Sequence, residues 1–357
     1  MDVGLFFLMQ RDEAWDERAV YESALAQMLE AEGLGYHSVW IAEHHFNDYG
    51  LCPAPPVLAS YVAARTRTLR LGMGVSLIPL HHPVDLAEQL ATLDVVSGGR
   101  LDVGVGRGGT LQDYQTFQSD RDESRARVEE GIALMRECWR GAPFDFKGRF
   151  HSAERLHVRP KPVQQPHPPL FVATNSEDSV LSAAKLGLPT MTSFFVPMAD
   201  VQRRHGLYRE TALGAGHAKA AIEARERASW LMRAVHVAPD RDAALRASEG
   251  PWMSYQHKMS KLRSDSAGGS VPNSFDRSLM KLRPFEDYVK EGWIIAGTPD
   301  EVREQLERDL ALAGAQRLLL VMALPGLDTP LALRSMRLFA EQVAPALTPP
   351  ALSAKVG

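Results

Sequence analysis

The sequence has few cysteines, no long uncharged run and little net charge, and each of these shortages excludes a class of protein. Its 357 residues include only two cysteines, too few for a disulfide framework or a structural zinc site. The longest run without Asp, Glu, Lys or Arg is 49–64, which prolines interrupt and which falls short of the ~20 apolar residues that span a bilayer. A formal charge of −4 gives nucleic acid no general attraction. We therefore expect a globular cytoplasmic protein that binds neither nucleic acid nor membrane.

What is present is an ordinary globular composition, with 45% apolar and 24% charged residues. Short apolar runs alternate with segments of helical apolar spacing. The predicted strands are 3–9, 38–42, 71–78, 101–105, 170–173, 190–195, 230–237 and 317–322. The predicted helices are 19–33, 55–64, 84–96, 122–139, 178–186 and 331–346. Strand-then-helix units in this number predict an α/β fold closed as a (β/α)8 TIM barrel, with a doubly wound sheet as the alternative.

Two segments do not fit a bare barrel. Residues 141–169, after the fourth strand, are rich in proline and carry no long periodic run, which predicts an ordered insertion. Residues 252–284, after the seventh strand, mix charged and small residues without a clear apolar period, which predicts a mobile loop. We expect the whole chain, 1–357, to form a single domain around the barrel.

The first cluster of reactive side chains lies where two predicted strands end, which is where barrel enzymes place their catalytic residues. Glu43, His44 and His45 follow the second strand, and His81 and His82 follow the third. Histidine exchanges protons near neutral pH, so these residues are catalytic candidates. A helix cap explains His82 equally well. A metal site is a third interpretation, but no HExxH pattern completes it.

The second cluster is the glycine-rich segment 104–109, after the fourth strand. It satisfies GxGxxG, but Glu129, at the place of a ribose-binding acid, lies within a charged helical pattern. We therefore reject a dinucleotide-binding site. Glycines still let a backbone approach a ligand closely, and Arg107 presents a fork of donors suited to phosphate. A plain glycine-rich turn with a surface arginine is the alternative.

The third cluster, 174–179, follows the fifth strand and opens a helix. Backbone N–H groups at a helix start, together with hydroxyl groups, form an anion pocket. Taken alone, the segment is better explained as an ordinary N-cap by Ser176. Taken with Arg107 on the neighbouring strand, it predicts a phosphate-bearing cofactor.

These segments stand in an order that resembles the bacterial luciferase-like flavin monooxygenases. The matching strings are WIAEHHF at 40–46, PLHHPV at 79–84, SGGRL at 97–101, GVGRG at 104–108, IIAGTP at 294–299 and ALRSMRLF at 332–339. The resemblance covers nearly the whole chain, except 141–169 and 252–284. It implies a (β/α)8 barrel that binds reduced FMN from a separate flavin reductase and lets it react with O2.

The resemblance also implies roles for individual residues. It places His44, His45 and Asp113 in catalysis and implies no metal site. It places in flavin binding Gly74 and Val75, joined by a cis peptide bond, and Gly106, Arg107, Gly108, Thr174, Asn175, Ser176 and Ser179. Two positions depart from luciferase: Gly106 replaces a reactive cysteine, and Phe194 replaces a tryptophan. These departures argue against light emission and a fatty-aldehyde substrate, and they leave oxygenation open.

We therefore expect a two-component monooxygenase that oxygenates a small apolar substrate through a flavin peroxide. The alternatives are hydride transfer with the deazaflavin F420, which related barrels bind, and a non-catalytic flavin-binding subunit of a heterodimer. The 43–46 string favours FMN, and the presence of His44, Arg107 and Asp113 argues against an inactive subunit. The expected partners are a flavin reductase, O2, the substrate and a second copy in a homodimer. The residues that would suit an apolar substrate, or equally a core, are Met191, Phe194, Phe195, Met198 and Trp252.

Overall fold

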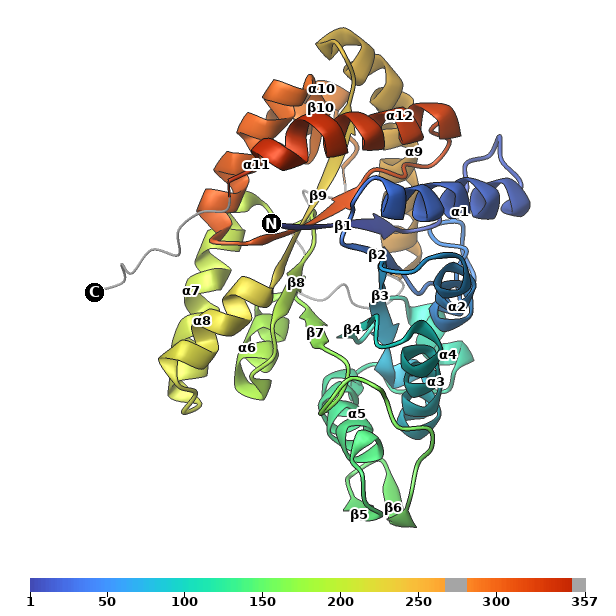
Figure 1. The fold of residues 1–357 in the computed structure, drawn as a ribbon, viewed down its shortest axis with the longest axis vertical. Helices are drawn as coiled ribbons and strands as arrows, with labels where there is room; N and C mark the ends of the chain where they lie inside the picture. Colours follow the sequence, from blue (N-terminus) through green and yellow to red (C-terminus); the bar gives the residue numbers. More distant parts are fainter. Residues whose placement is uncertain (267–280, 349–357) are drawn as a thin grey trace.

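Eight parallel strands close into a barrel in the computed structural model, which describes residues 1–266 and 281–348 (Figure 1). The barrel strands are β1 (Asp2–Phe7), β2 (Ser38–Ile41), β3 (Arg70–Leu77), β4 (Leu101–Gly106), β7 (Leu170–Ala173), β8 (Thr190–Thr192), β9 (Trp230–Val237) and β11 (Arg317–Val321). The ring closes because β8 pairs with both β7 and β9. The structure therefore confirms the predicted TIM barrel.

Helices surround this barrel (Figure 1). They are α1 (Glu17–Gly33), α2 (Pro55–Arg65), α3 (Pro83–Ser97), α4 (Leu111–Thr116), α5 (Ser124–Trp139), α6 (Glu177–Leu186), α7 (Met198–Gly214), α8 (Lys219–Ala228), α9 (Arg241–Ser266), α10 (Phe285–Lys290), α11 (Pro299–Ala313) and α12 (Thr329–Leu338), with short turns η1 (Ile78–Leu80), η3 (Phe339–Val343) and η4 (Ala344–Ala346). Sequence-local signals end several of them. The residue after α3, α6 and α11 is a glycine with left-handed backbone, the usual way to close a helix.

Outside the segment 141–169, one strand was not predicted. β10 (Ile294–Gly297) pairs in parallel with the C-terminal half of β9, from Ile294 opposite Ala234 to Gly297 opposite Val237. It extends the sheet beyond the eight barrel strands, since β11 pairs only with the first half of β9. Another difference is at 190–195, where the strand ends at Thr192 and the two phenylalanines that follow lie in a loop. The helices α4, α7, α8, α10 and α11 were not predicted either.

The segment 141–169 contains a two-stranded antiparallel hairpin, β5 (Phe144–Lys147) and β6 (Ser152–Leu156). The hairpin projects away from the barrel beside α5 (Figure 1). It is anchored there by Glu130 of α5, whose carboxylate accepts backbone N–H bonds from Arg149, Phe150 and His151. Polar anchoring of this kind leaves little apolar periodicity for a sequence pattern to reveal.

The loop predicted for 252–284 is wrong for its first part. Residues 252–266 belong to α9, and 281–284 lead into α10, while 267–280 lie outside the described residues. Trp252, Tyr255 and Met259 share one face of α9 and are buried against the barrel mouth. Pro251 inside the helix and the charged residues between these apolar positions obscured the period.

Large aromatic rings fill the half of the barrel that lies at the N-terminal ends of its strands. Trp40 of β2 packs edge-on against Phe171 of β7 and Trp230 of β9, with centroid distances of 5.5 and 5.6 Å. Gly72 of β3 lies so close to the Trp40 indole that no Cβ would fit. The interior is therefore packed at the N-terminal ends of the strands, which leaves space only at their C-terminal ends.

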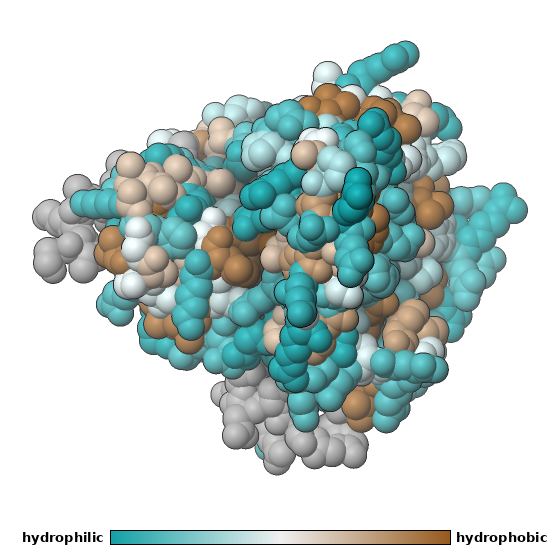
Figure 2. Space-filling view, turned by 90° about the horizontal axis from the view of Figure 1, so that it is seen from below, coloured by the Kyte–Doolittle hydropathy of each residue, from teal (hydrophilic) through white to brown (hydrophobic). Residues whose placement is uncertain are grey.

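The face of the molecule seen in Figure 2 is mostly hydrophilic. Figure 2 shows one face on which apolar side chains form small, separate groups among polar ones, as expected for a globular protein in water. Within the described ranges no helix is long and apolar enough to cross a membrane.

Candidate active site

A cavity of about 390 Å³ opens at the C-terminal ends of the barrel strands. It has two chemically different ends. Charged and hydroxyl side chains from the ends of β4 and β7 and the starts of α5 and α6 line one end, and apolar side chains from β1, β8, β9 and α9 line the other. Residues from β2 and β3 lie between them. Such a pocket can hold a ligand that is anionic at one end and apolar at the other.

Three arginines gather at the polar end. Arg107 follows β4, Arg121 lies in the loop before α5, and Arg125 is in the first turn of α5. Burial lowers the pKa of Arg107, and the neighbouring charges of Arg125 and Arg121 lower it further. Only Arg125 has a carboxylate partner in this group, within the described residues: Asp178 at 2.7 Å. An anion bound between these guanidinium groups would relieve their mutual repulsion.

The start of α6 completes this end. Ser176 caps the helix, accepting from the Ser179 N–H, while the Ser179 hydroxyl accepts from the Ser176 N–H at 3.1 Å. Asn175, Ser176 and Ser179 all line the cavity. A helix N-terminus carries partial positive charge, so it adds to the attraction of the arginines for an anion.

Glycines shape the floor between the two ends. The Gly74–Val75 peptide bond is cis, as the resemblance implies. The Val75 side chain leaves no room for a side chain at Gly106, because a Cβ there would lie 2.6 Å from Val75 Cγ2. A Cβ on Gly74 would likewise lie 2.6 Å from the Phe6 ring. Glycine at 106 is thus required by the position of Val75, which accounts physically for the departure from the luciferase cysteine.

Glu43 is the centre of a buried hydrogen-bond cluster beside the cavity. Its carboxylate accepts from His81 Nε2 at 2.7 Å, His45 Nε2 at 3.1 Å and the Leu77 N–H at 3.0 Å. Burial alone would raise the pKa of Glu43, but the bonds from the two histidines and the Leu77 amide hold that pKa below its usual value. Burial lowers and the Glu43 carboxylate raises the pKa of His81, and the net result is a raised pKa. The structure shows no metal-holding group of three His, Cys, Asp or Glu side chains among the described residues.

His44 lies on the cavity side of this cluster. Its half-buried ring packs edge-on against Tyr49, with centroids 4.8 Å apart, and lies directly over Gly50. Burial lowers the pKa of His44 to about 4, so the ring is neutral at pH 7 and can accept a proton. Its ring nitrogens make no hydrogen bond to any other described residue, which leaves them available to a ligand.

Asp113 of α4 also lines the cavity, and its side chain is 3% exposed. Its Oδ1 has no hydrogen-bond partner within the described part of the chain. Burial raises the pKa of this carboxyl. A buried oxygen without a partner is costly, so its position points to a polar group that a ligand brings.

The structure brings most of the sequence-predicted site residues to one cavity. Those that line it are His44, Gly74, Val75, Gly106, Arg107, Gly108, Asp113, Asn175, Ser176 and Ser179. His45 does not: its ring lies behind Glu43 and packs against Phe117, with centroids 4.9 Å apart. Sequence reasoning missed Arg121 and Arg125, which lie among acidic residues just before and at the start of α5, where no motif marks them.

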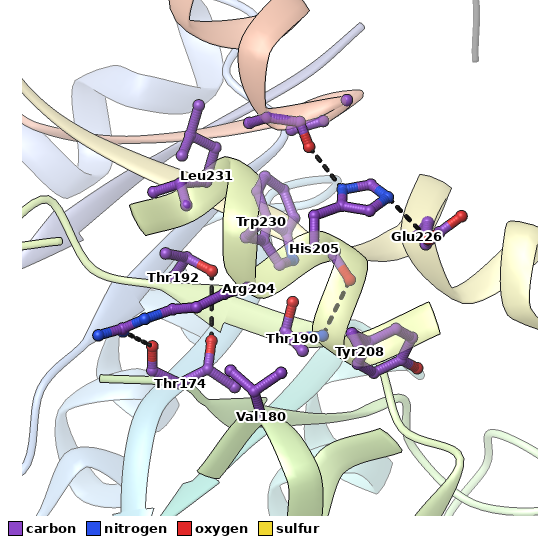
Figure 3. Close-up of a pocket in the computed structure, with 15 residues that line it drawn as sticks. Thr174, Val180, Thr190, Thr192, Arg204, His205, Tyr208, Glu226, Trp230 and Leu231 are labelled. Carbon is purple, nitrogen blue, oxygen red and sulfur yellow. Dashed lines mark hydrogen bonds and ion pairs between the residues drawn. The ribbon is translucent and has the colours of Figure 1, made fainter. Parts of the chain in front are cut away.

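Thr174 also lies elsewhere. Its side chain faces a second, smaller pocket of about 60 Å³ between β8, β9 and α7 (Figure 3). There its hydroxyl contacts the Thr192 hydroxyl at 3.2 Å, and Arg204 reaches its carbonyl oxygen (Figure 3). Thr174 thus does not line the larger cavity, because its side chain is turned to the outside of the barrel. Its part in cofactor binding stays a prediction.

Comparisons of the sequence with known proteins identify a family and several relatives. Residues 1–317 match the family described as luciferase-like monooxygenase. The chain is 31% identical to the oxygenase component of the flavin-dependent trigonelline monooxygenase of Acinetobacter baylyi, over 50% of each chain. It is 29% identical to the N-acetyl-S-alkylcysteine monooxygenase of Bacillus subtilis, over 80% of each chain. The chain spans about half the length of the first curated relatives that it matches.

Solved structures show the same architecture. The crystal structure of monooxygenase RslO1 from Streptomyces bottropensis has a TM-score of 0.84 at 30% identity, covering 97% of this chain and 99% of that chain. The oxygenating constituent of 3,6-diketocamphane monooxygenase from Pseudomonas putida, in complex with FMN, has a TM-score of 0.82 at 22% identity, covering 98% and 99%. The second likeness supports the fold alone. The chain belongs to the luciferase-like monooxygenase family.

Proposed function

We propose that this protein is the oxygenase of a two-component system, using reduced FMN and O2 to oxygenate a small organic substrate. The observation that carries the proposal is the two-ended cavity: Arg107, Arg121 and Arg125 face the start of α6 at one end, and an apolar chamber with His44 on its wall forms the other. FMN fits the polar end and the glycine-lined middle of this cavity, because its phosphate is a dianion and its ring system is flat, and the apolar chamber beyond the ring is then left for a substrate.

The residues present fit this cofactor. The arginine cluster, in which Arg121 and Arg125 lower the pKa of Arg107, supplies the partner that a phosphate requires. The unpartnered Oδ1 of Asp113 offers a hydrogen-bond acceptor, or a donor when protonated, to the polar edge of a flavin ring. Gly74 and Gly106, at which no Cβ fits, keep the floor of the cavity open. We propose Arg107, Asn175, Ser176 and Ser179 as phosphate-end residues, with Gly74, Val75, Gly106 and Gly108 near the ring.

Reduced FMN would supply the two electrons that O2 needs to deliver one oxygen atom to a substrate. The chain contributes proton handling and exclusion of water. The neutral His44 ring can accept a proton from a bound substrate, and the buried Glu43 cluster next to it fixes the end of β2 from which His44 projects. The apolar walls from β1, β8 and β9 keep water from reaching the reacting atoms.

We propose two partners. A flavin reductase supplies reduced FMN, which the name of one relative, an oxygenase component, supports by analogy. A second copy of the chain forms a homodimer, which is supported by exposed apolar side chains on two adjacent helices. They are Val57 and Tyr61 on α2, 72% and 48% exposed, and Val95 and Val96 on α3, 42% and 62% exposed.

An anaerobic titration tests the proposed function. The full-length protein is titrated with oxidised FMN, photoreduced FMN and F420, and binding is followed by calorimetry. We expect reduced FMN to bind with a dissociation constant on the order of micromolar, and NADH oxidation to require an added flavin reductase. Tight binding of F420 without a response to FMN would instead assign the protein to hydride transfer.

A further inference from the structure

The apolar end of the cavity has the chemistry of a substrate site, an assignment that rests on the proposed function. Its lining comes from β1, β8 and β9, with Phe6, Leu8, Met191, Phe194, Phe195 and Met232 as the main side chains. Met259 and Leu262 of α9 cover it. The described residues that line it from these four elements include no Lys, Arg, Asp or Glu. A charged group placed there would lose its hydration without gaining a partner, so the site selects an uncharged molecule.

The wall of this end is aromatic and firmly supported. The rings of Phe194 and Phe195 lie 4.1 Å apart, and Tyr255 of α9 backs both, with centroid distances of 5.6 and 5.7 Å. The Phe195 and Tyr255 planes differ by only 11°. Trp252 stacks on the other side of Tyr255 at 5.3 Å. Fixed rings give a planar aromatic ligand offset-stacked or edge-to-face contacts, which a saturated molecule of the same size cannot make.

Three methionines face the same space, Met191, Met232 and Met259. Thioether sulfur is polarizable and makes favourable contacts with aromatic rings, and the unbranched side chain adapts to the shape of a bound ring. The methionines therefore reinforce the selection of aromatic over aliphatic ligands.

A polar contact is available on one side of this chamber. His44 and Tyr49, which pack against each other at the end of β2, both line the cavity. The Tyr49 hydroxyl is 3.4 Å from the Tyr255 hydroxyl, and either can donate to the other. A neutral imidazole and a phenol together can both donate to and accept from one oxygen atom of a ligand.

We propose that the substrate is an uncharged, planar aromatic molecule with a hydroxyl or carbonyl group, its ring against Phe194 and Phe195 and its oxygen at His44 and Tyr49. The observations carry this further than a general apolar preference because Phe6, Phe194 and Phe195 all line the chamber and because His44 and Tyr49 together offer a donor and an acceptor at the end of β2.

A calorimetric comparison of two probes tests the proposal. The full-length protein, with and without saturating FMN, is titrated with 2-naphthol and with decahydro-2-naphthol, which has the same skeleton and hydroxyl without the aromatic ring. We expect 2-naphthol to bind about tenfold more tightly or better. We expect Phe195→Leu to reduce that preference below about threefold, while the matched control Phe150→Leu, outside the cavity, leaves it intact. Equal binding of the two probes by the wild-type protein overturns the proposal, whether or not a variant folds.

A second arm tests the polar contact. Tyr49→Phe is expected to weaken 2-naphthol several-fold and to leave naphthalene unchanged, because only the hydroxyl-bearing probe has a partner to lose. Equal weakening of both probes would show that Tyr49 contributes packing alone and would overturn its assigned role. The FMN affinity measured in the same samples separates the two proposals. Failure to bind FMN contradicts the proposed function, whereas loss of probe preference with FMN binding intact contradicts only the substrate class.

Discussion

Arg107 holds its charge among other guanidinium groups, and burial already lowers its pKa. A charge-assisted hydrogen bond to phosphate is worth about 1.5–3 kcal/mol. Arg107→Ala should therefore raise the dissociation constant of reduced FMN by roughly tenfold to a hundredfold, measured by anaerobic calorimetry. Arg149→Ala, on the exposed hairpin, is the matched control. An unchanged affinity in Arg107→Ala would mean that the phosphate lies elsewhere.

His44 is the residue whose protonation the cavity controls most directly. A positioned acid–base group contributes roughly 10²–10⁴ in rate, so His44→Ala should cut product formation a hundredfold or more. Because burial lowers the pKa of His44 to about 4, the wild-type rate should stay level as pH falls from 7 to 5 and decline only near pH 4. Product formation at saturating reduced FMN and substrate, followed by chromatography, checks both. A decline centred near pH 6.5 would contradict the proposed role.

At the scale of elements, the contact between β9 and α11 depends on a buried ion pair. Arg233, 1% exposed, donates from Nε to Asp309 Oδ2 at 2.6 Å, and Asp309 also accepts from Gln305 at 2.9 Å. Asp309→Asn would leave the arginine charge buried without a counter-charge, which costs about 3–5 kcal/mol. Urea denaturation followed by circular dichroism measures the loss. Arg337→Ala, which breaks an exposed pair with Glu30, should cost under about 1 kcal/mol; similar losses in both variants would contradict the argument.

The elements show what a sequence pattern can and cannot reveal. The barrel strands were predictable because buried parallel strands are continuous apolar runs bounded by turns. β10 was not, because its short run pairs with only the last half of β9, and this pairing is decided by tertiary contact. The 252–266 part of α9 was not, because Pro251 and charged residues break up an apolar face that burial nevertheless stabilises.

The same contrast holds for the site. Residues at strand ends, such as His44 and Arg107, were predictable because the barrel fold fixes where strand ends meet. Arg121 and Arg125 were missed because a mixed-charge segment before a helix is usually solvent-facing, and only the folded chain turns these two side chains toward the cavity. His45 and Thr174 do not line the cavity, because adjacent residues project in opposite directions and the motif alone does not say which one faces inward. The roles expected of them stay predictions.

At the scale of the whole molecule, acid should weaken the fold in two steps. Burial lowers the pKa of His44 and of His236 to about 4, so between pH 6.5 and 4 the unfolded chain binds protons that the folded chain does not. The free energy of unfolding therefore decreases as the pH is lowered through this range. Glu32 accepts backbone N–H bonds from Arg67, Thr68 and Leu69, which lower its pKa to about 2. The contribution of the Glu32 carboxylate to the stability of the fold is present above pH 4.5 and is lost as the pH falls from 4.5 towards 2.

His236 isolates the first step, because its side chain is 2% exposed and its Nδ1 has no partner among the described residues. At pH 5 the unfolded histidine is protonated and the folded one is not, a difference of about 2 kcal/mol that vanishes at pH 7.5. His236→Leu removes the titrating group and fills a similar volume. The drop in unfolding free energy between pH 7.5 and pH 5.0, measured by urea denaturation, should shrink by about 2 kcal/mol in this variant. His157→Leu, at an exposed position, should leave the drop unchanged. If His236→Leu loses as much stability on acidification as the wild-type protein, the folded barrel does not hold His236 neutral, and the first step of acid destabilisation has another origin.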